Sequence, residues 1–180
     1  MANYKRIFID GYRYYLTVVT HHRNPILIDN VDLLRDAFHL VKQDYIFSID
    51  AIVILPDHFH MIILPERACD YPDIIKNIKR HFSRHCPAEF YQHVPQSVSR
   101  TKNGHKPIWQ KRYYEHAIRD EQEYQALLDY IHYNPVKHRI TDKPKKWKYS
   151  SFHKFVSVGA YAEDWCDYRD NINFENKFPI

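Results

Sequence analysis

The hydrophobic pattern of the chain changes period several times, and each change marks the end of one predicted element and the start of the next. Residues 12–21, 45–55, 58–64 and 113–118 are rich in aromatic and β-branched side chains, which is typical of strands. A short Pro-Asp turn at residues 56–57 separates the second run from the third. We therefore expect these two strands to form a hairpin.

Helical spacing of apolar residues predicts two helices between these strands. The first begins at Asp29 or Asn30, either of which can cap a helix, and carries apolar residues through position 41. The second covers residues 74–82. Residues 87–107 contain Pro, Ser and Lys with a single Gly, so we expect a loop or a mobile crossover there.

A third helix follows the last predicted strand. Asp120 caps this helix, and Glu123 three residues later completes a capping box. We expect the helix to end near Tyr133, because Pro135 disfavours helical geometry in the residue before it. Aromatic residues then recur over positions 147–155, and we expect them to pack back against the body as a C-terminal extension.

The predicted order is strand, helix, strand, strand, helix, strand, helix. This order is typical of an α+β fold, a ferredoxin-like split β-α-β arrangement with a mostly antiparallel sheet, here with a C-terminal extension. The 180 residues suit one domain, which we place at residues 1–158, followed by an acidic tail at residues 159–180. This fold hosts many functions, so particular residues have to indicate the chemistry.

Composition excludes several large classes of enzyme. The chain has three glycines, Gly11, Gly104 and Gly159, and no two of them lie close together. It therefore contains no GxGxxG fingerprint, P-loop or GxSxG elbow, which excludes Rossmann dinucleotide enzymes, P-loop nucleotide hydrolases and ordinary serine hydrolases. Tyrosine and histidine are abundant instead, with 15 and 13 copies, and they supply groups for stacking, metal ligation and nucleophilic chemistry.

Charge and cysteine usage indicate a partner and a compartment. The net charge is +4, and because the last twenty residues are acidic, the rest of the chain is more basic than this value. A basic body with interspersed aromatic residues favours a nucleic-acid partner, although a solvated basic surface would have the same composition. The longest apolar run, residues 51–55, is too short to cross a membrane. Three widely spaced cysteines and an N-terminus without an apolar stretch predict a cytoplasmic protein that contacts no membrane.

Two histidines lie on one predicted strand. His58 and His60 are two residues apart, so alternation places both imidazoles on one face, while Phe59, Met61 and Ile63 face the helices. We expect the histidine face to be exposed. Two adjacent imidazoles can chelate a divalent cation, which would need a third ligand from elsewhere and would keep positions open for a phosphate oxygen. The alternative is a pair of solvent-facing histidines without a metal.

The third helix carries a second pair of reactive groups. Tyr130 and Asn134 are four residues apart and share one helical face, beside a core stripe formed by Tyr124, Leu128 and Ile131. A phenol needs activation before it attacks a phosphate at neutral pH, and a nearby cation would supply it. Asn134 could supply the third metal ligand through its side-chain oxygen. Taken alone, Tyr130 would be an ordinary packing or surface aromatic.

These pieces occur in an order that resembles a known family. The His-Phe-His strand is similar to the His-hydrophobe-His motif of HUH endonucleases. Residues 109–119 resemble the Trp-Gln…Arg…Glu-His-x-Ile-Arg stretch of REP-associated tyrosine transposases, and residues 129–138 resemble their Tyr-Ile-x-x-Asn-Pro-Val-Lys-His block. Residues 147–153 are similar to their Trp-Pro-Tyr-Ser-Ser motif. Arg139 and Lys148 depart from the glycine and the proline of the family pattern.

The resemblance implies a metal-dependent single-stranded DNA endonuclease and strand transferase. On the family pattern, Tyr130 is the nucleophile that forms a covalent 5′-phosphotyrosine, while His58, His60 and Asn134 hold Mg²⁺ or Mn²⁺. The implied substrate is a short palindromic DNA hairpin with a single-stranded flank, and no ATP is needed. A homodimer is compatible with this function.

Basic residues that we expect to contact DNA phosphates lie in three clusters. They are Lys76, Lys79, Arg80, Arg84, Lys111, Arg112 and Lys137. Two other functions are compatible with the same residues. A non-catalytic nucleic-acid-binding module would need only the basic and aromatic residues, and a metal-dependent phosphodiesterase would use an activated water in place of Tyr130. A covalent protein–DNA adduct separates the transferase from both.

Overall fold

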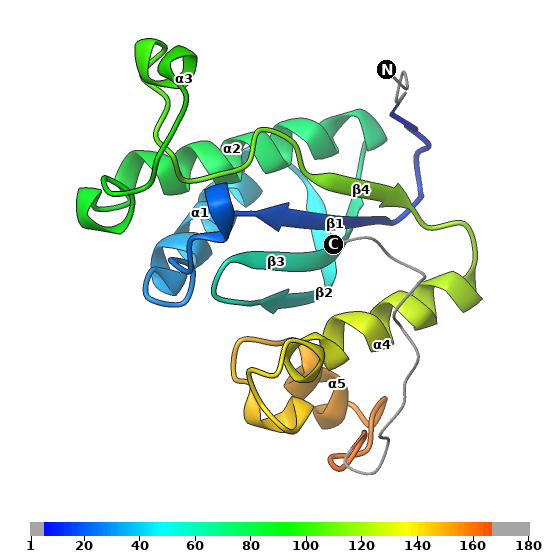
Figure 1. The fold of residues 1–180 in the computed structure, drawn as a ribbon. Coiled ribbons are helices and arrows are strands. Elements are labelled where there is room, and N and C mark those ends of the chain that lie inside the picture. Colours follow the sequence, from blue (N-terminus) through cyan, green and yellow to red (C-terminus); the bar gives the residue numbers. More distant parts are fainter. Residues whose placement is uncertain (1–5, 167–180) are drawn as a thin grey trace.

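A four-stranded antiparallel sheet forms the centre of the computed structural model, which describes residues 6–166 (Figure 1). The strands are β1 (Tyr14–Val19), β2 (Phe47–Ile54), β3 (His58–Pro65) and β4 (Tyr114–Ala117). They lie in the order β2-β3-β1-β4, and each neighbouring pair is antiparallel. The predicted α+β fold with a ferredoxin-like split β-α-β arrangement is confirmed, because β3 lies between the two strands that the first helix joins.

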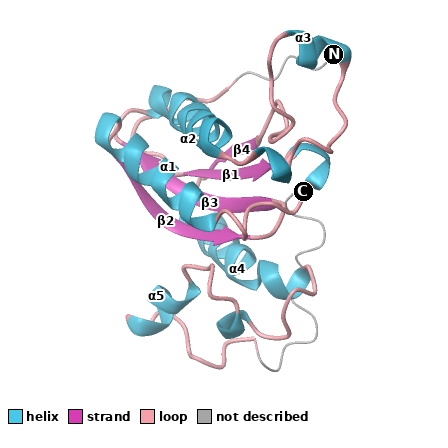
Figure 2. Cartoon of the chain, turned by 90° about the vertical axis from the view of Figure 1, so that its left-hand side faces the viewer, coloured by secondary structure: helices cyan, strands magenta, loops and turns pink. Residues whose placement is uncertain are grey.

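Helices cover both faces of this sheet. α1 (Val31–Asp44) and α2 (Tyr71–His85) pack on one face, and α4 (Glu121–Lys137) crosses the other (Figures 1 and 2). The predicted loop at residues 87–107 contains one short helix, α3 (Val98–Lys102), and a 3₁₀ turn. Within residues 6–166, no helix has the length and apolar character needed to cross a membrane.

Side-chain alternation along β3 follows the prediction, but the exposure of one face does not. Phe59, Met61 and Ile63 pack in the core with α1 and α2. The opposite face, expected to be exposed, is buried: His58 is 1% exposed and His60 is 0% exposed. The physical reason is that α4 packs across this face of β2 and β3, so both sides of the strand belong to the interior.

The prediction that the third helix ends near Tyr133 is wrong, since α4 continues through Pro135 to Lys137. Pro135 lies close to the C-terminal end, where it removes one backbone donor without interrupting a long stretch of helix. The helix then closes with two backbone hydrogen bonds, from Arg139 N to Val136 O at 2.9 Å and from Ile140 N to Pro135 O at 2.9 Å. This pairing is a Schellman motif, in which the residue at the Arg139 position has left-handed backbone angles.

Arg139 is strained in this motif, because its φ of 56° is one that glycine adopts more readily. We expect Arg139→Gly to stabilise the fold by about 1 kcal/mol and to raise the melting temperature by about 2–4 °C. Thermal unfolding monitored by circular dichroism measures the shift. Arg139→Ala is the control and should give no comparable gain, because it removes the same side chain and keeps the Cβ. Equal melting temperatures for the Gly and Ala variants would contradict the backbone explanation.

The C-terminal extension packs against the body as predicted, along the outer edge of β2. Ile54 N donates to Tyr149 O at 2.9 Å, and Ser151 N donates to Ile52 O at 2.8 Å. α5 (Phe152–Ser157) buries Phe152 completely. Of the predicted acidic tail, residues 159–166 are described, and residues 167–180 lie outside the described part of the chain.

Candidate active site

The two strand histidines are each held through Nδ1 by a neighbouring polar group. His58 Nδ1 donates to Asp57 Oδ1 at 2.6 Å. His60 Nδ1 lies 2.7 Å from the Tyr15 hydroxyl and 2.8 Å from Thr17 Oγ1. Strand pairing explains the second contact, because Thr17 on β1 is directly opposite His60 on β3. With the proton on Nδ1, each ring has a free lone pair on Nε2.

Both Nε2 atoms are buried and have no hydrogen-bond partner. A buried nitrogen without a hydrogen-bond partner lowers the stability of the fold, unless a ligand binds to it in the functional protein. The rings themselves lie close together, with a centroid separation of 4.9 Å between His58 and His60. Two metal-ligating histidines would have this arrangement, with each Nδ1 held by a neighbouring polar group and each Nε2 free to bind the metal.

The electrostatics of the site favour the neutral forms of His60 and His138. Burial lowers the pKa of His60 well below the usual value, and the neighbouring His58 and His138 charges act in the same direction. Burial, reinforced by His58, lowers the pKa of His138 to about 4. Although burial alone would favour the neutral acid, the hydrogen bond with His58 and the ion pair with Arg23 lower the pKa of Asp57 to about 2. A neutral imidazole is the form that metal ligation requires.

Helix α4 carries three polar side chains of the candidate site. Tyr130, Asn134 and Lys137 stand at positions i, i+4 and i+7, which share one helical face. Lys137 reaches this face because the helix continues past Pro135. Its Nζ donates to the Tyr130 hydroxyl at 3.2 Å and lies 4.7 Å from the centre of the same ring. The Tyr130 ring stands edge-on to His60, with centroids 5.4 Å apart.

Tyr130 lies within the core rather than beside it, which corrects the prediction from helical spacing. Its side chain is 1% exposed and belongs to one buried cluster with Leu127, Leu128 and Ile131, whereas Tyr124 is only partly buried. The reason is that the sheet face under α4 is wide enough to contact more than one stripe of the helix. The buried position places the phenol beside the two histidines.

The residues present fit a divalent cation. Asn134 is completely buried, and neither its side-chain oxygen nor its nitrogen has a hydrogen-bond partner. Two imidazole nitrogens and one amide oxygen form a mixed donor set that leaves positions open for phosphate oxygens. Within residues 6–166, no three His, Cys, Asp or Glu side chains are placed to hold a metal together.

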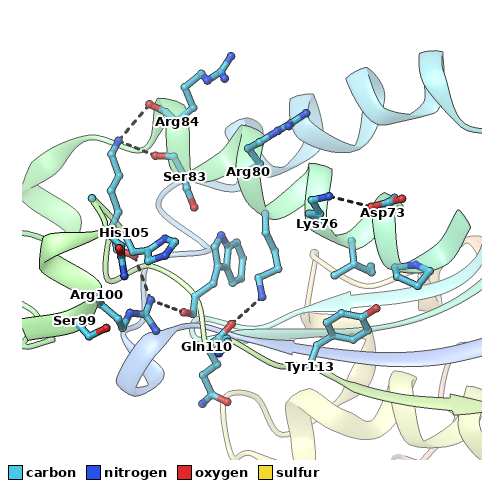
Figure 3. Close-up of a pocket in the computed structure, with 18 of the residues that line it drawn as sticks. Asp73, Lys76, Arg80, Ser83, Arg84, Ser99, Arg100, His105, Gln110 and Tyr113 are labelled. Carbon is cyan, nitrogen blue, oxygen red and sulfur yellow. Dashed lines mark hydrogen bonds and ion pairs between the residues drawn. The ribbon is translucent and has the colours of Figure 1, made fainter. Parts of the chain in front are cut away.

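The predicted DNA-binding residues separate into three locations. Lys76, Lys79, Arg80, Arg84 and Lys111 line one groove beside α2 (Figure 3). Arg112 is exposed and lies outside that groove. Lys137 contacts the Tyr130 phenol instead.

Sequence reasoning missed four residues of the site: Tyr15, Thr17, Asp57 and His138. Asp57 directly precedes the histidine strand, and His138 ends the Tyr-Asn block, so their positions were signals that could have been used. The His138 ring packs 5.0 Å from the His58 ring. Tyr15 and Thr17 had no local signal, because their contact with His60 depends on the register between β1 and β3.

Comparison with known proteins agrees with this geometry. The family described as transposase IS200 like matches residues 9–134. A REP-associated tyrosine transposase of Escherichia coli K12 is 36% identical over 168 residues, which cover 92% of each chain. A Haemophilus influenzae protein that is provisionally named a REP-associated tyrosine transposase is 41% identical over 167 residues. The match covers 92% of this chain and 93% of that protein. A solved structure of a REP-associated tyrosine transposase bound to a REP hairpin is 35% identical, with a TM-score of 0.80 over 100% of this chain and 99% of that one.

The fold and the family match define an IS200-like transposase, an enzyme class of the HUH type. Within that class, the chain belongs to the family of REP-associated tyrosine transposases.

Proposed function

We propose that this protein cleaves and rejoins single-stranded DNA beside a short hairpin, with Tyr130 as the nucleophile and His58, His60 and Asn134 as ligands of Mg²⁺ or Mn²⁺. One observation carries the proposal: two buried, unpartnered imidazole nitrogens lie beside a tyrosine whose hydroxyl is held by Lys137. The REP hairpin bound to the structural relative supports a hairpin substrate. Membership in a transposase family favours a strand transferase over a non-catalytic binding module.

In the proposed step, the Tyr130 oxygen attacks a backbone phosphorus, and the bond from that phosphorus to the 3′ oxygen breaks. The products are a 5′-phosphotyrosine and a free 3′-hydroxyl, which takes up the equivalent of the proton that the phenol loses. A second 3′-hydroxyl reverses the step and joins two strands. A divalent cation held by the three ligands supplies positive charge to the phosphate oxygens. Because the phenol is 1% exposed, DNA binding has to open access to it.

The test of this function is covalent capture. Wild-type protein is incubated with an end-labelled hairpin that carries a single-stranded flank, in the presence of Mn²⁺ or Mg²⁺, and the mixture is separated on a denaturing gel. We expect a labelled protein band whose adduct maps to the peptide containing Tyr130. Efficient cleavage without an adduct would support the activated-water mechanism and contradict the proposal.

The cytoplasmic location and the homodimer that the sequence suggested stay predictions.

Lys137 is expected to act as a positioning residue for the nucleophile rather than as a DNA contact. Its ammonium group can stabilise the phenolate of Tyr130 at a distance of 3.2 Å in a site with little water. We expect Lys137→Met to lower the cleavage rate by about a hundredfold, with a much smaller effect on DNA affinity. Lys137→Arg should restore part of the activity, because it keeps a cation beside the phenol.

Lys146→Met provides the matched control. Lys146 lies in the same basic segment, but its ammonium group pairs with Asp142 at 2.7 Å on the surface, away from Tyr130. We expect this variant to cleave at the wild-type rate. Equal losses of affinity and cleavage in Lys137→Met, with no recovery of cleavage in Lys137→Arg, would assign Lys137 to DNA binding instead.

A further inference from the structure

A strained turn holds an arginine at the edge of the histidine site. This 3₁₀ turn, His21–Arg23, follows β1, and both His22 and Arg23 have positive φ, at 52° and 53°. Residues with a Cβ rarely adopt these angles, because the left-handed region brings the Cβ against the backbone. Two consecutive residues in this region lower the stability of the fold, and strain of this kind is concentrated at functional sites.

Hydrogen bonds attach this turn to the loop that begins the histidine strand. Thr20 N donates to Asp57 O at 2.9 Å on one side of the turn. On the other side, Leu27 N donates to Pro56 O at 2.9 Å. Arg23 therefore has a fixed place relative to the start of β3, where the two histidines lie.

The Arg23 guanidinium is only partly engaged by the protein. Arg23 Nη1 donates to Asp57 Oδ2 at 3.0 Å, while Asp57 Oδ1 accepts from His58 Nδ1 at 2.6 Å. The Arg23 side chain is 45% exposed, and within residues 6–166 Asp57 is its one ionic partner. Because a guanidinium carries five N–H donors, most of them are available to a ligand that arrives from solvent.

The Arg23 charge is unfavourable for a metal on the histidines. Two contacts, through Asp57 and the His58 ring, link the guanidinium to the unpartnered Nε2. Burial is the main cause of the lowered pKa of His60, and the Arg23 charge acts in the same direction, so its field reaches the second histidine. Like charges repel strongly where little water screens them. A divalent cation, Arg23 and Lys137 would together face one carboxylate among the described residues of the site.

An anion bound at Arg23 would neutralise this excess of positive charge and give the strained turn a function. The DNA backbone supplies such an anion at every nucleotide, and the planar guanidinium binds phosphate oxygens through paired donors. Since Asp57 and the His58 ring lie between Arg23 and Nε2, one phosphate is not expected to contact both places. The neighbouring phosphate of the same strand suits Arg23 better.

We propose that Arg23 binds the phosphodiester next to the one that Tyr130 attacks, and thereby holds the unpaired strand in register with the nucleophile. This inference rests on the proposed function, since it assigns a second phosphate of the same substrate. It gives Arg23 a direct contact with DNA. Its role differs from that of Lys137, which acts on the phenol.

The test is a phosphate scan with the full chain. The hairpin carries one methylphosphonate at a time in its single-stranded flank, which removes one negative charge from the backbone. Binding is measured by fluorescence anisotropy with Mn²⁺, in Tyr130→Phe and in Tyr130→Phe/Arg23→Met, so that no adduct forms. Arg23 is exposed, and its replacement by Met should not affect folding.

We expect Arg23→Met to weaken binding of the unmodified DNA by about tenfold, the effect of losing one charge-assisted contact. One methylphosphonate should weaken binding by Tyr130→Phe to the same extent and leave the double variant unaffected. Mapping of the bond that the wild type cleaves should place this phosphate next to it. Arg23→Lys should restore part of the affinity, because it keeps the charge and loses the paired donors.

Arg67→Met is the matched control. Arg67 also pairs with an aspartate, Asp70, at 2.9 Å, but it follows the opposite end of β3 from His58. We expect it to bind DNA like its parent at every position of the scan. The rise in melting temperature with Mn²⁺ should be at least as large in Arg23→Met as in the wild type, because the removed group is a cation.

Unchanged affinity in Arg23→Met, an equal response at every methylphosphonate, or an Arg23-dependent phosphate remote from the cleaved bond would overturn the assignment. Loss of the Mn²⁺ response in Arg23→Met would show instead that Arg23 only positions Asp57 and His58. Absence of any adduct in the wild type would contradict the proposed cleavage function, while the scan would still report the contact between Arg23 and a phosphate.

Discussion

Replacing Tyr130 by Phe is expected to eliminate the covalent protein–DNA adduct and to lower cleavage by about four orders of magnitude or more. The substitution removes one oxygen and keeps the ring that packs against His60 and Tyr15. Loss of the hydrogen bond from Lys137 should cost about 1 kcal/mol of stability, far less than the effect on catalysis. Noncovalent DNA binding should survive, since phosphate contacts do not need the phenol.

Tyr124→Phe is the matched control for this prediction. Tyr124 lies on the same helix, but its hydroxyl is 3.5 Å from Asp50 and not beside the histidines. We expect this variant to form the adduct at the wild-type rate. A denaturing gel with end-labelled hairpin DNA, followed by peptide mapping, measures the outcome. A persistent adduct in Tyr130→Phe, or one that maps to Tyr113, Tyr114 or Tyr133, would show that another tyrosine is the nucleophile.

Removing the divalent cation is expected to lower cleavage about as much as Tyr130→Phe does. A chelator should abolish cleavage by the wild type, and added Mn²⁺ or Mg²⁺ should restore it. His60→Gln should lower cleavage by more than about a hundredfold, beyond the typical cost of losing an outer-shell partner. Mn²⁺ should raise the melting temperature of the wild type and leave that of His60→Gln unchanged, which reports metal binding independently of activity.

The burial of His60 makes a stability control necessary. Replacing this ring removes the hydrogen bonds that His60 Nδ1 makes with the Tyr15 and Thr17 hydroxyls, at a cost of about 1–3 kcal/mol. His132→Gln removes another fully buried histidine, which bonds Ser151 Oγ at 2.8 Å outside the site. We expect His132→Gln to be destabilised to a similar extent and still to respond to Mn²⁺. Undiminished cleavage in excess chelator would rule out the metal site.

Local sequence patterns were sufficient for the elements of the fold. Alternating and helical periods depend on neighbouring residues only, so the four strands and the helices α1, α2 and α4 lie within a few residues of their predicted positions. The same periodicity predicted that Phe59, Met61 and Ile63 face α1 and α2. Asp120 caps α4 as expected, accepting a hydrogen bond from Glu123 N at 2.8 Å. The chemical types of the reactive residues were also evident, because His58, His60, Tyr130 and Asn134 occur in recognisable motifs.

Tertiary packing decided which of these residues meet and how deeply they lie. The histidine face is buried because α4, about sixty residues later in the chain, packs on it, and no local pattern specifies that contact. Continuation of α4 through Pro135 places Lys137 on the phenol of Tyr130, although its basic character alone had indicated a DNA contact. The groove beside α2 likewise needs two walls from separate segments. Periodicity specifies the face on which a side chain lies, whereas long-range packing specifies what that face contacts.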